Sequence, residues 1–353
     1  MSAVLTRSPR DCLPTLLLMK NTQVSDNLDD GVFKTLTFST GRPLRLAIVG
    51  AGSLGLYYGI KFAEAGWDVH FLMRSGFEEA KSAGIRLFSQ FGDRHLRNPK
   101  VYQKTEDMGG MDCVFISLKA TANSILKTVI PPLVSAETAV ITIENGLGSE
   151  EVLAQFLPAR QILGALSFSS LTRSSPTVVH EGGRGSTSIG EYSQKIISPR
   201  VKTLVANLQE VGHQAKAVAD LMEERWRKLV WNIPFNGLAV TEGQATADRI
   251  LSTPNLLAKC KSLMQEVITA ANALGFPIEA DYQNFQLERS AHMGAYRPST
   301  LIDFEAGREL EVEAIWGTPL RRAQTAGLEM PYLTQLYRRL CELNPGSVNQ
   351  ESK

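Results

Sequence analysis

The sequence predicts an α/β domain built around a parallel sheet, followed by an all-helical domain. The first observation is that short β-branched runs alternate with helical segments from Leu44 onward, which is typical of a parallel sheet. The second is that apolar residues recur three and four positions apart after about Ser198, as they do in amphipathic helices. The length of 353 residues also exceeds that of one typical domain. We therefore expect one domain at residues 44–219 and another at residues 220–345.

The elements of the first domain can be assigned in chain order. The expected strands are LRLAIVG (44–50), WDVHFLMR (67–74), MDCVFISLK (111–119) and TAVITIENG (138–146), with the helix SLGLYYGIKFAEAG (53–66) after the first of them. Ligands of such sheets bind beyond the carboxyl ends of the strands, so the chemistry is expected there. Residues 160–192 are dense in glycine, serine and threonine, which indicates an antiparallel edge with turns.

The helical part of the chain contains one segment with an unusual polar face. The spacing of apolar residues predicts helices at 199–212, 221–240, 254–274 and 309–326. Within the second of these helices, Lys228, Asn232 and Asn236 recur every fourth position among tryptophan, leucine, valine and phenylalanine. A step of four residues turns a helix by only about 40°, so these polar side chains share one face.

Composition and charge exclude several classes of function. The chain is 43% hydrophobic and 21% charged, and a formal net charge of +1 provides no field that would attract nucleic acid or an acidic membrane. Four widely separated cysteines form no CxxC pair, and the histidines show no metal-binding spacing, so we expect neither disulfides nor a metal. The expected location is the cytoplasm, and no nucleic-acid or membrane partner is expected.

The two ends of the chain lie outside the predicted domains. Residues 1–43 are expected to form a poorly ordered extension, and residues 346–353 a short tail. No apolar run approaches the roughly 18 to 20 residues that a membrane-spanning helix requires. The apolar run LPTLLLM follows Arg7 and Arg10, so an organelle-targeting sequence is the alternative for this extension, although Asp11 interrupts the pattern.

A glycine-rich loop follows the first strand and opens the first helix. GAGSLG consists of Gly50, Ala51, Gly52, Ser53, Leu54 and Gly55. In this position the three glycines permit a tight turn, the approach of a pyrophosphate and close packing of helix on strand, while the helix N-terminus supplies N–H donors. We therefore predict a Rossmann-type dinucleotide-binding domain, the alternative being a glycine-rich turn that holds no ligand.

Polar residues at three strand ends bear on the choice of cofactor. The second strand ends in Arg74, where an NAD-selective site usually has an acidic residue. A guanidinium there would pair with a 2′-phosphate, so NADPH is favoured over NADH, although a solvated arginine is the alternative. Lys119 and Asn145 end the next two strands and place a cation and an amide at the same edge, unless they are ordinary loop residues.

Lys228 has two interpretations on physical grounds. If its helix face closes against another domain, the lysine loses hydration, its pKa falls, and it can act as a general acid toward a carbonyl oxygen. Alternatively, Lys228 extends to water, and the two asparagines bend or cap the helix around Pro234. The segment alone does not decide between them.

The set of motifs resembles the ketopantoate reductase (2-dehydropantoate 2-reductase) family over nearly all of residues 44–343. The matching motifs, in chain order, are GAGSLG, LMR, SLKA, ENGLG, the WRKL-x3-N-x3-N helix and PSTLIDFEAGRELEVE. Several of these have no counterpart in the generic dinucleotide-binding pattern. The resemblance implies a Rossmann-type domain, a helical substrate domain and reduction of a 2-oxo acid.

The resemblance also implies roles for particular residues. Lys228 takes the place of the family's catalytic lysine, which donates a proton to the ketone oxygen, and Glu311 takes the place of the active-site glutamate. Asn232 and Asn236 are similar to substrate-binding amides, and Ser299 to the serine that binds the substrate carboxylate.

The cofactor side of the site is carried over in the same way. Arg74 matches the arginine that contacts the 2′-phosphate, and Lys119 and Asn145 match positions near the nicotinamide, with Asn145 also reaching the substrate. The GAGSLG loop and Glu311 complete the set of cofactor-binding residues that the resemblance implies.

Three positions leave questions open. Glu309, Glu311 and Glu313 alternate, and such a cluster is usually a solvated acidic face, so Glu311 is assigned by its spacing from Ser299 and Asp303, with Asp303 as a candidate partner. The chain also departs from the family pattern, because Glu144 stands where glutamine or histidine is more frequent and Trp316 where asparagine is. A carboxylate at 144 would alter local charge, and Trp316 would narrow the pocket, which leaves the identity of the 2-oxo acid open.

The expected function is NADPH-dependent reduction of 2-dehydropantoate to (R)-pantoate in the route to pantothenate and coenzyme A. Alternatives are a reductase of another 2-oxo acid, an imine-forming relative that joins an amino acid to a 2-oxo acid, or a protein that senses NADPH without turnover. The last would have lost its substrate residues, and here they are present. The amphipathic helices of the second domain are also compatible with a homodimer.

Overall fold

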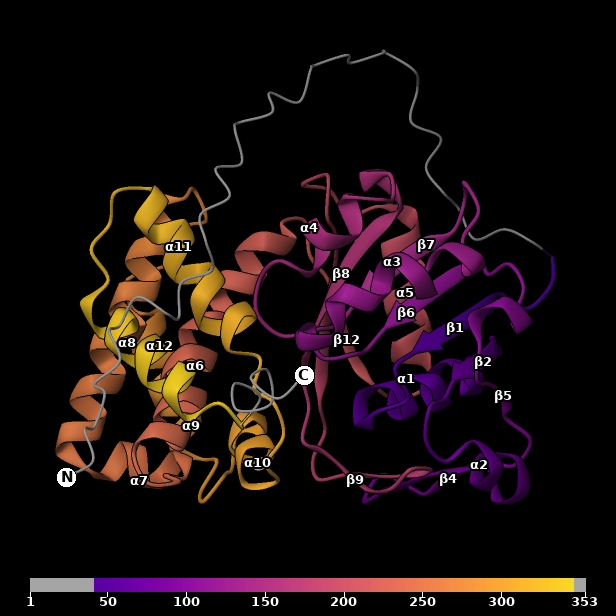
Figure 1. The fold of residues 1–353 in the computed structure, drawn as a ribbon, viewed down its shortest axis with the longest axis horizontal. Helices are drawn as coiled ribbons and strands as arrows, with labels where there is room; N and C mark the ends of the chain where they lie inside the picture. Colours follow the sequence, from indigo (N-terminus) through magenta and orange to yellow (C-terminus); the bar gives the residue numbers. More distant parts are fainter. Residues whose placement is uncertain (1–40, 346–353) are drawn as a thin grey trace, which may run out of the picture.

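The chain forms a sheet-containing domain and a helical domain that lie next to each other. The computed structural model describes residues 41–345, and the predicted extension and tail fall almost entirely outside this range. Figure 1 shows the sheet domain on the right and the helical domain, which contains helix α6, Leu221–Thr241, on the left. The predicted fold class, an α/β domain followed by a helical one, is confirmed. The domain boundary at residue 219 stays a prediction.

The main sheet has eight strands in the order β12-β11-β8-β7-β6-β1-β2-β5. Their bounds are β1 Arg45–Val49, β2 Asp68–Leu72, β5 Lys100–Tyr102, β6 Cys113–Ile116, β7 Ala139–Thr142, β8 Ile162–Phe168, β11 Ser186–Glu191 and β12 Gln214–Ala217. Pairing from β5 through to β8 is parallel, and β11 runs antiparallel to β8, as predicted for that edge. In this register Val49 lies opposite Leu72 and Ile116, so the carboxyl ends of β1, β2 and β6 are level.

Apolar cores cover both faces of the main sheet. Strands β6 and β7 are buried at every position, because a parallel sheet between two layers has no solvent-facing side. One core contains residues of α1 and α5, and the other contains residues of α3, η3 and α4. The helices of this domain are α1 Ser53–Glu64, α2 Phe77–Ala83, α3 Leu126–Val129, α4 Ser149–Ala154 and α5 Pro199–Glu210, with short 3-10 segments η1 Thr105–Asp107, η2 Ala120–Ile125, η3 Pro131–Leu133 and η4 Ala159–Gln161.

A second, smaller sheet was not predicted from the sequence. Its strand order is β4-β3-β10-β9, with bounds β3 Ile85–Ser89, β4 Arg94–Leu96, β9 Leu171–Ser175 and β10 Val178–Glu181. It lies at the bottom of the sheet domain in Figure 1, where β9 and β4 are labelled. The sheet is assembled from two segments about 80 residues apart, so its pairing has no local signal. The β9–β10 hairpin is the part that bears on the cofactor site.

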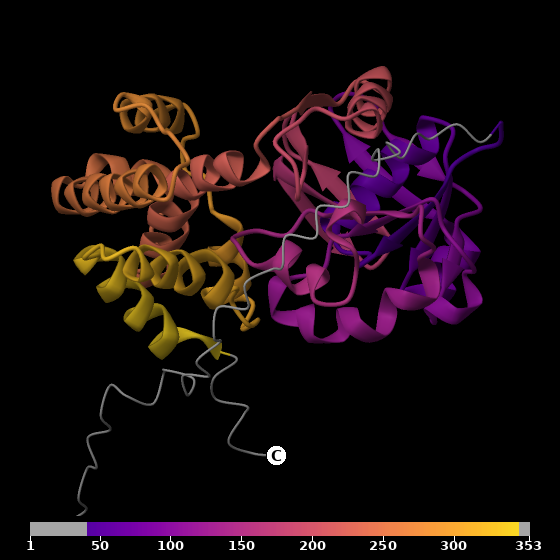
Figure 2. The same cartoon turned by 90° about the horizontal axis from the view of Figure 1, so that it is seen from above.

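The helical domain is organised around α6. Its other elements are α7 Ala247–Ser252, α8 Pro254–Ala273, α9 Tyr282–Ala291, α10 Ser299–Glu305, the π-helical turn η5 Glu313–Gly317, α11 Thr318–Thr325 and α12 Pro331–Leu343. Helix α6 begins where Asp220 Oδ1 accepts from the backbone N–H groups of Met222 and Glu223, at 3.1 and 3.0 Å. It packs against α8, α10 and α12. Figure 2 shows this bundle beside the sheet domain, seen from above.

The predicted helices agree with the structure except at one end. The segments expected at 199–212, 221–240 and 254–274 are α5, α6 and α8. The helix expected to begin at residue 309 is wrong at its start, because 309–311 is not helical and the regular turns begin near Glu313. The Leu310 N–H donates to Asn344 Oδ1 at 2.9 Å, and Glu311 is bonded to the sheet domain, so both are held outside the helix. Among residues 41–345, no helix is long and apolar enough to span a membrane.

Candidate active site

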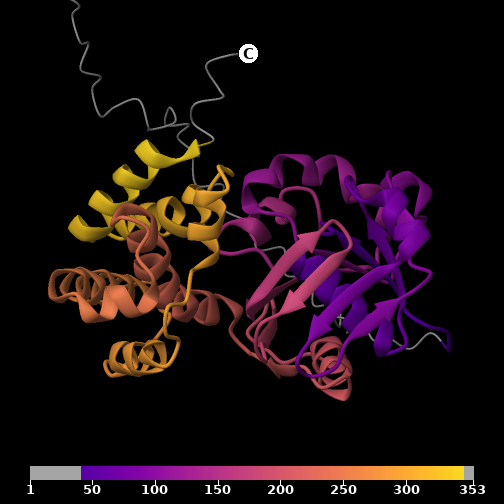
Figure 3. The ribbon, with the colours of Figure 1, turned by 90° about the horizontal axis from the view of Figure 1, so that it is seen from below.

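The polar face of α6 meets the carboxyl edge of the main sheet. Lys228 Nζ donates to Asn145 Oδ1 at 2.9 Å, and Asn145 lies three residues after the end of β7. The Lys228 residue is only 8% exposed. Extension of this lysine to water, the alternative left open above, is therefore not what the structure shows. Figure 3 shows, from below, the helical domain facing the strands of the sheet domain.

The environment of Lys228 favours its neutral form. Burial, together with the charge of Arg225, lowers the pKa of Lys228 to about 7, while the carboxylate of Glu311 opposes both effects. The ring of Phe168, at the end of β8, lies with its centroid 5.3 Å from Lys228 Nζ, which provides a weak cation–π contact. A lysine with such a pKa gives up a proton near neutral pH, as a general acid must.

Glu311 reaches across from the helical domain to the same place. Its Oε1 accepts from the backbone N–H of Ala120 at 2.9 Å, and its Oε2 from Asn145 Nδ2 at 3.4 Å. Burial raises the pKa of Glu311, and the Ala120 hydrogen bond opposes this. Asn145 is thus bonded to both Lys228 and Glu311, and the amide is fixed with its oxygen toward the lysine.

The other two glutamates of the alternating cluster lie elsewhere. Glu309 is exposed, and Glu313 is bonded to Arg321 at 2.6 Å and to the hydroxyl of Tyr337. Of the three, Glu311 is the one that contacts the sheet domain.

Lys119 and Asp303 form a second contact between the domains. Lys119 Nζ lies 2.6 Å from Asp303 Oδ2, and Arg308 Nε lies 2.8 Å from Asp303 Oδ1. Asp303, considered above as a partner of Glu311, is instead paired with two cations. Both Lys119 and Asp303 are still close enough to influence the pKa of Glu311, in opposite directions. The sheet-edge lysine therefore faces the same interdomain region as Lys228.

The candidate substrate residues line α6 and the start of α10. Asn232 and Asn236 are 6% and 3% exposed, and Asn236 Nδ2 donates to the backbone oxygen of Asn232 at 3.0 Å. Within residues 41–345, the buried Asn236 Oδ1 has no hydrogen-bond partner. Ser299 is the exposed first residue of α10, which packs against α6. The structure places Ser299 near this helix but, in the described part of the chain, forms no hydrogen bond from it to Lys228 or the asparagines.

The GAGSLG loop has the geometry that a dinucleotide phosphate requires. Gly50 adopts a φ of +103°, and a Cβ there would lie 2.8 Å from the backbone nitrogen of Leu118. A Cβ at Gly55 would overlap the Gly50 carbonyl, whereas one at Gly52 would meet nothing within 4 Å. The loop is thus tightly packed on the protein side and open at Gly52, where the N-terminus of α1 begins. The residues present fit a bound pyrophosphate.

Arg74 lies beyond the end of β2, at the same edge of the sheet as this loop. Its side chain is exposed, and α2 begins three residues later. An exposed guanidinium thus follows β2 at the sheet edge that also carries the GAGSLG loop. Its role in choosing the cofactor stays a prediction.

Two residues that depart from the family pattern have structural partners. Glu144 is 3% exposed and accepts a hydrogen bond from the hydroxyl of Ser149, and burial raises its pKa from 4.5 to about 7. Trp316 is fully buried in the helical core, and its indole donates to the backbone oxygen of Ile233 at 3.0 Å. Trp316 thus packs against the polar-faced helix from within the helical core.

We expect Glu144→Gln to stabilise the protein in a pH-dependent way. Because the folded carboxyl has a raised pKa, the folded state binds more protons than the unfolded state between about pH 4.5 and 7, so the native protein loses stability as the pH rises through this window. Glutamine does not titrate. The gain in free energy of unfolding should be near zero at about pH 4 and reach about 2 to 3 kcal/mol at about pH 8.

Urea denaturation at the two pH values measures this difference. The exposed Glu137→Gln is the matched control and should change stability little at either pH. A gain for Glu144→Gln that is equal at both pH values would show that the Glu144 carboxyl is not the titrating group.

Two contributors to the site were not found from the sequence. Arg225, three residues before Lys228 on α6, donates to the backbone oxygens of Glu144 at 3.0 Å and Gly146 at 3.2 Å, on either side of Asn145. It also forms a buried ion pair with Glu150. The signal for Arg225 was its helical spacing from Lys228, which places both on one side of the helix. For Phe168 there was no sequence signal.

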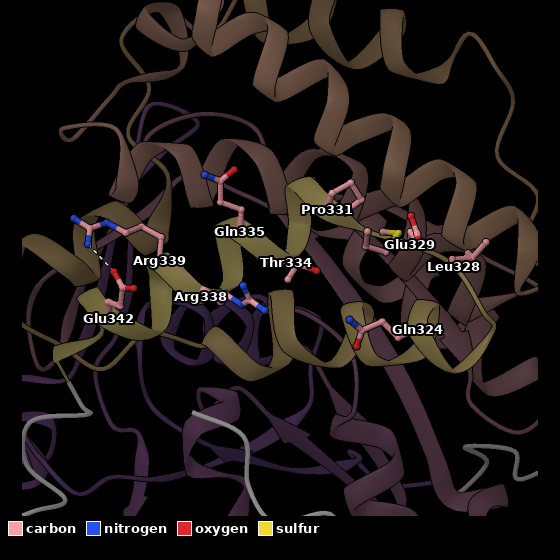
Figure 4. Close-up of a pocket in the computed structure, with 10 residues that line it drawn as sticks. Gln324, Leu328, Glu329, Pro331, Thr334, Gln335, Arg338, Arg339 and Glu342 are labelled. Atoms are coloured by element: carbon pink, nitrogen blue, oxygen red, sulfur yellow. Dashed lines mark hydrogen bonds and ion pairs between the residues drawn. The ribbon is translucent and has the colours of Figure 1, made fainter. Parts of the chain in front are cut away.

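Two surface hollows can be compared with this site. One of about 610 Å³ is bounded by Phe168, Arg289 and residues of β11, β12, α6 and α9, so it adjoins the environment of Lys228. The other, of about 760 Å³, lies between α11 and α12 (Figure 4), where Arg338, Arg339 and Glu342 are among the lining residues. None of the site residues predicted from the sequence lines either hollow. The hydrogen bonds of Lys228, Asn145 and Glu311 place the candidate site in the interdomain region.

Comparison with known protein families agrees with this geometry. The family model described as ketopantoate reductase PanE/ApbA matches residues 46–194, and its C-terminal counterpart matches residues 220–344. The chain belongs to the ketopantoate reductase family. This is a family of oxidoreductases that act on CH–OH groups and have a dinucleotide-binding fold. The resemblance inferred from the motifs is confirmed.

Individual ketopantoate reductases are similar over most of the chain. The 2-dehydropantoate 2-reductase of Nostoc sp. is 36% identical over 300 residues, which are 84% of this chain and 94% of that protein. The crystal structure of 2-dehydropantoate 2-reductase from Geobacter metallireducens is 40% identical with a TM-score of 0.82, covering 85% of this chain and 99% of its own. That from Methylococcus capsulatus is 30% identical with a TM-score of 0.80, covering 88% and 98%.

Proposed function

We propose that this protein reduces 2-dehydropantoate to (R)-pantoate with NADPH. The observation that carries the proposal is the hydrogen-bonded arrangement of Lys228, Asn145 and Glu311, which joins the two domains of a ketopantoate reductase fold at the carboxyl edge of its sheet. A buried lysine of lowered pKa, at the sheet edge that also carries the GAGSLG loop, can supply the proton that reduction of a ketone requires.

The cofactor half of the site is proposed to hold NADPH. The open side of the GAGSLG loop and the N-terminus of α1 receive the pyrophosphate, and Arg74 pairs with the 2′-phosphate. The nicotinamide end lies toward Lys119, which follows β6, and Asn145, which follows β7. Glu311 lies there too, because it accepts a hydrogen bond from the backbone N–H of Ala120, the residue after Lys119. When bound, the reduced nicotinamide supplies a hydride to the keto carbon of the substrate.

The substrate half is proposed to lie against α6 and the start of α10. Asn232 and Asn236 present amide groups on the same face as Lys228. The buried Asn236 Oδ1, which accepts no hydrogen bond from any residue of 41–345, is suited to a substrate hydroxyl. The hydroxyl of Ser299, at the N-terminus of α10, binds the substrate carboxylate. These contacts orient the acid so that its ketone oxygen lies at Lys228.

Lys228 completes the reaction by supplying the proton. As negative charge develops on the ketone oxygen, the ammonium of Lys228 donates its proton there, and the C=O group becomes CH–OH. Asn145 Oδ1 holds Nζ in place during this transfer, and Glu311 holds the Asn145 amide. The buried surroundings make the resulting neutral lysine stable, which is the physical use of its low pKa.

The pH dependence of turnover should follow the titration of Lys228. The acid form is required, so kcat/KM for the keto acid should fall about tenfold per pH unit above a pKa of about 7. Initial rates of NADPH oxidation at saturating NADPH, measured across neutral and alkaline pH, provide the test. Glu144→Gln should keep this decline, although Glu144 has a similar pKa. A rate constant that stays level well into alkaline pH would remove Lys228 as the proton donor.

The substrate assignment is tested with 2-dehydropantoate against a panel of other 2-oxo acids. The expected result is that 2-dehydropantoate gives the highest kcat/KM for NADPH oxidation. A higher value with another 2-oxo acid would reassign the substrate but keep the chemistry. NADPH binding without oxidation by any keto acid would contradict the enzymatic proposal and favour a sensor.

A further inference from the structure

The β9–β10 hairpin of the small sheet reaches the dinucleotide loop. Arg173 lies on β9 and is exposed, and its Nη1 donates to the backbone oxygen of Ala51 at 3.1 Å. Ala51 stands between the first two glycines of GAGSLG. A guanidinium from a strand 122 residues away is therefore held against the loop that receives the cofactor phosphates.

The hairpin is fixed in this position by contacts near its turn. The hydroxyl groups of Thr177 and Ser175 both donate to Glu79 Oε1 on α2, the latter at 3.1 Å. A Cβ at Gly76 would overlap the Pro176 side chain, so the turn also packs closely against the segment that follows Arg74. Arg173 is thus carried by a hairpin whose turn is anchored beside the end of β2. This anchoring limits the ordering entropy that ligand binding would cost.

The positive groups around the GAGSLG loop favour binding of an anion. Helix α1 begins at Ser53, with no acidic residue in its first turn and no side chain that caps its N-terminus, so the positive end of its dipole faces the loop without a local carboxylate. Within residues 41–345, no carboxylate lies within ion-pair distance of Arg173. Its one hydrogen bond leaves most of the guanidinium N–H donors available. In the described part of the chain, the loop thus combines a helix N-terminus, open space at Gly52 and an arginine that forms no ion pair.

We propose that Arg173, held at the backbone oxygen of Ala51, binds the pyrophosphate of the dinucleotide. This inference rests on the proposed NADPH-dependent function. The guanidinium keeps its hydrogen bond to Ala51 and donates other N–H groups to phosphate oxygens, so that the backbone donors of α1 and the side chain of Arg173 hold the same group. The small sheet is then the part of the fold that supplies a second set of donors to the cofactor.

If Arg173 binds the pyrophosphate, its loss should affect cofactor binding differently from the loss of Arg74. NADPH and NADH share the pyrophosphate and differ in the 2′-phosphate. Loss of Arg173 should therefore weaken both cofactors by the same factor, whereas loss of Arg74 should weaken NADPH alone. The alternative for Arg173 is a purely structural tie, in which its hydrogen bond only holds the loop.

Direct binding measurements on the full chain test this inference. We expect Arg173→Ala and Arg173→Gln each to raise the Kd of NADPH and of NADH about 10- to 100-fold, measured by calorimetric titration. Glutamine keeps an N–H donor for the Ala51 carbonyl but has no charge, and Arg173→Lys, which keeps the charge, should recover part of the affinity. The matched control is Arg184→Ala, another exposed arginine on the loop after β10, which should bind both cofactors like the wild type.

Each contrary outcome has a distinct meaning. Normal binding by Arg173→Gln would overturn the proposal in favour of the structural tie, and loss confined to NADPH would place the guanidinium at the 2′-phosphate instead. An equal loss of cofactor affinity in Arg184→Ala would show that the effect arises from the general charge of the surface and would overturn the proposal. Failure of the wild-type protein to bind either dinucleotide would contradict the proposed function itself. Thermal unfolding without ligand should be the same for all variants, because both arginines are exposed.

Discussion

Replacement of Lys228 by alanine should lower kcat at least about 100-fold and leave the affinity for NADPH nearly unchanged. The lysine is the only cation bonded to the Asn145 side chain among the described residues. Its loss removes the proton donor but no contact to the GAGSLG loop. Steady-state kinetics at saturating substrate and fluorescence titration with NADPH measure the two quantities separately.

A charge-conserving variant distinguishes proton transfer from simple charge stabilisation. Arginine at position 228 keeps a positive charge but does not lose a proton near neutral pH, so Lys228→Arg should have low kcat and no decline in rate above a pKa of about 7. Near-normal kcat in Lys228→Ala would remove the lysine from the mechanism. Circular dichroism should show that both variants keep the native fold.

Replacement of Arg74 by alanine should weaken NADPH binding about 10- to 100-fold and leave NADH binding nearly unchanged. The exposed guanidinium follows β2 at the ribose side of the loop, where it would form charge-assisted hydrogen bonds to the 2′-phosphate that NADH lacks. Parallel calorimetric titrations with the two cofactors measure the ratio. An equal loss for both would discard the 2′-phosphate contact.

Local sequence patterns were sufficient for the parts of the molecule that depend on neighbours in the chain. The glycines of GAGSLG are required by a turn of six residues, and the polar face of α6 follows from a spacing of four. The strands β1, β6 and β7 are short apolar runs in a known alternation with helices. For this reason the fold class and the shared helix face of Lys228, Asn232 and Asn236 could be predicted, whereas the burial of that face could not.

The remaining features depend on contacts between distant segments. The pairing of β3 with β10 has no local signal, so the small sheet and the position of Arg173 were missed. Arg225 could be placed on the helix but not assigned its partners, because Glu150 and the backbone oxygen of Glu144 belong to the other domain. The choice of Glu311 among three glutamates came from the family resemblance, and only the fold shows that it contacts Ala120.

The hydrogen bonds from Lys228 to Asn145 and from Asn145 to Glu311 make activity depend on the docking of the two domains. Each domain has its own apolar core, and Leu147 of the sheet domain also packs into the helical one. The candidate site, however, joins residues 83 and 166 positions apart and exists only while the domains are docked. A substitution that loosens the docking surface can therefore abolish turnover while both cores keep their full resistance to denaturation. A normal thermal unfolding curve would therefore not show that the catalytic residues of the two domains are in contact.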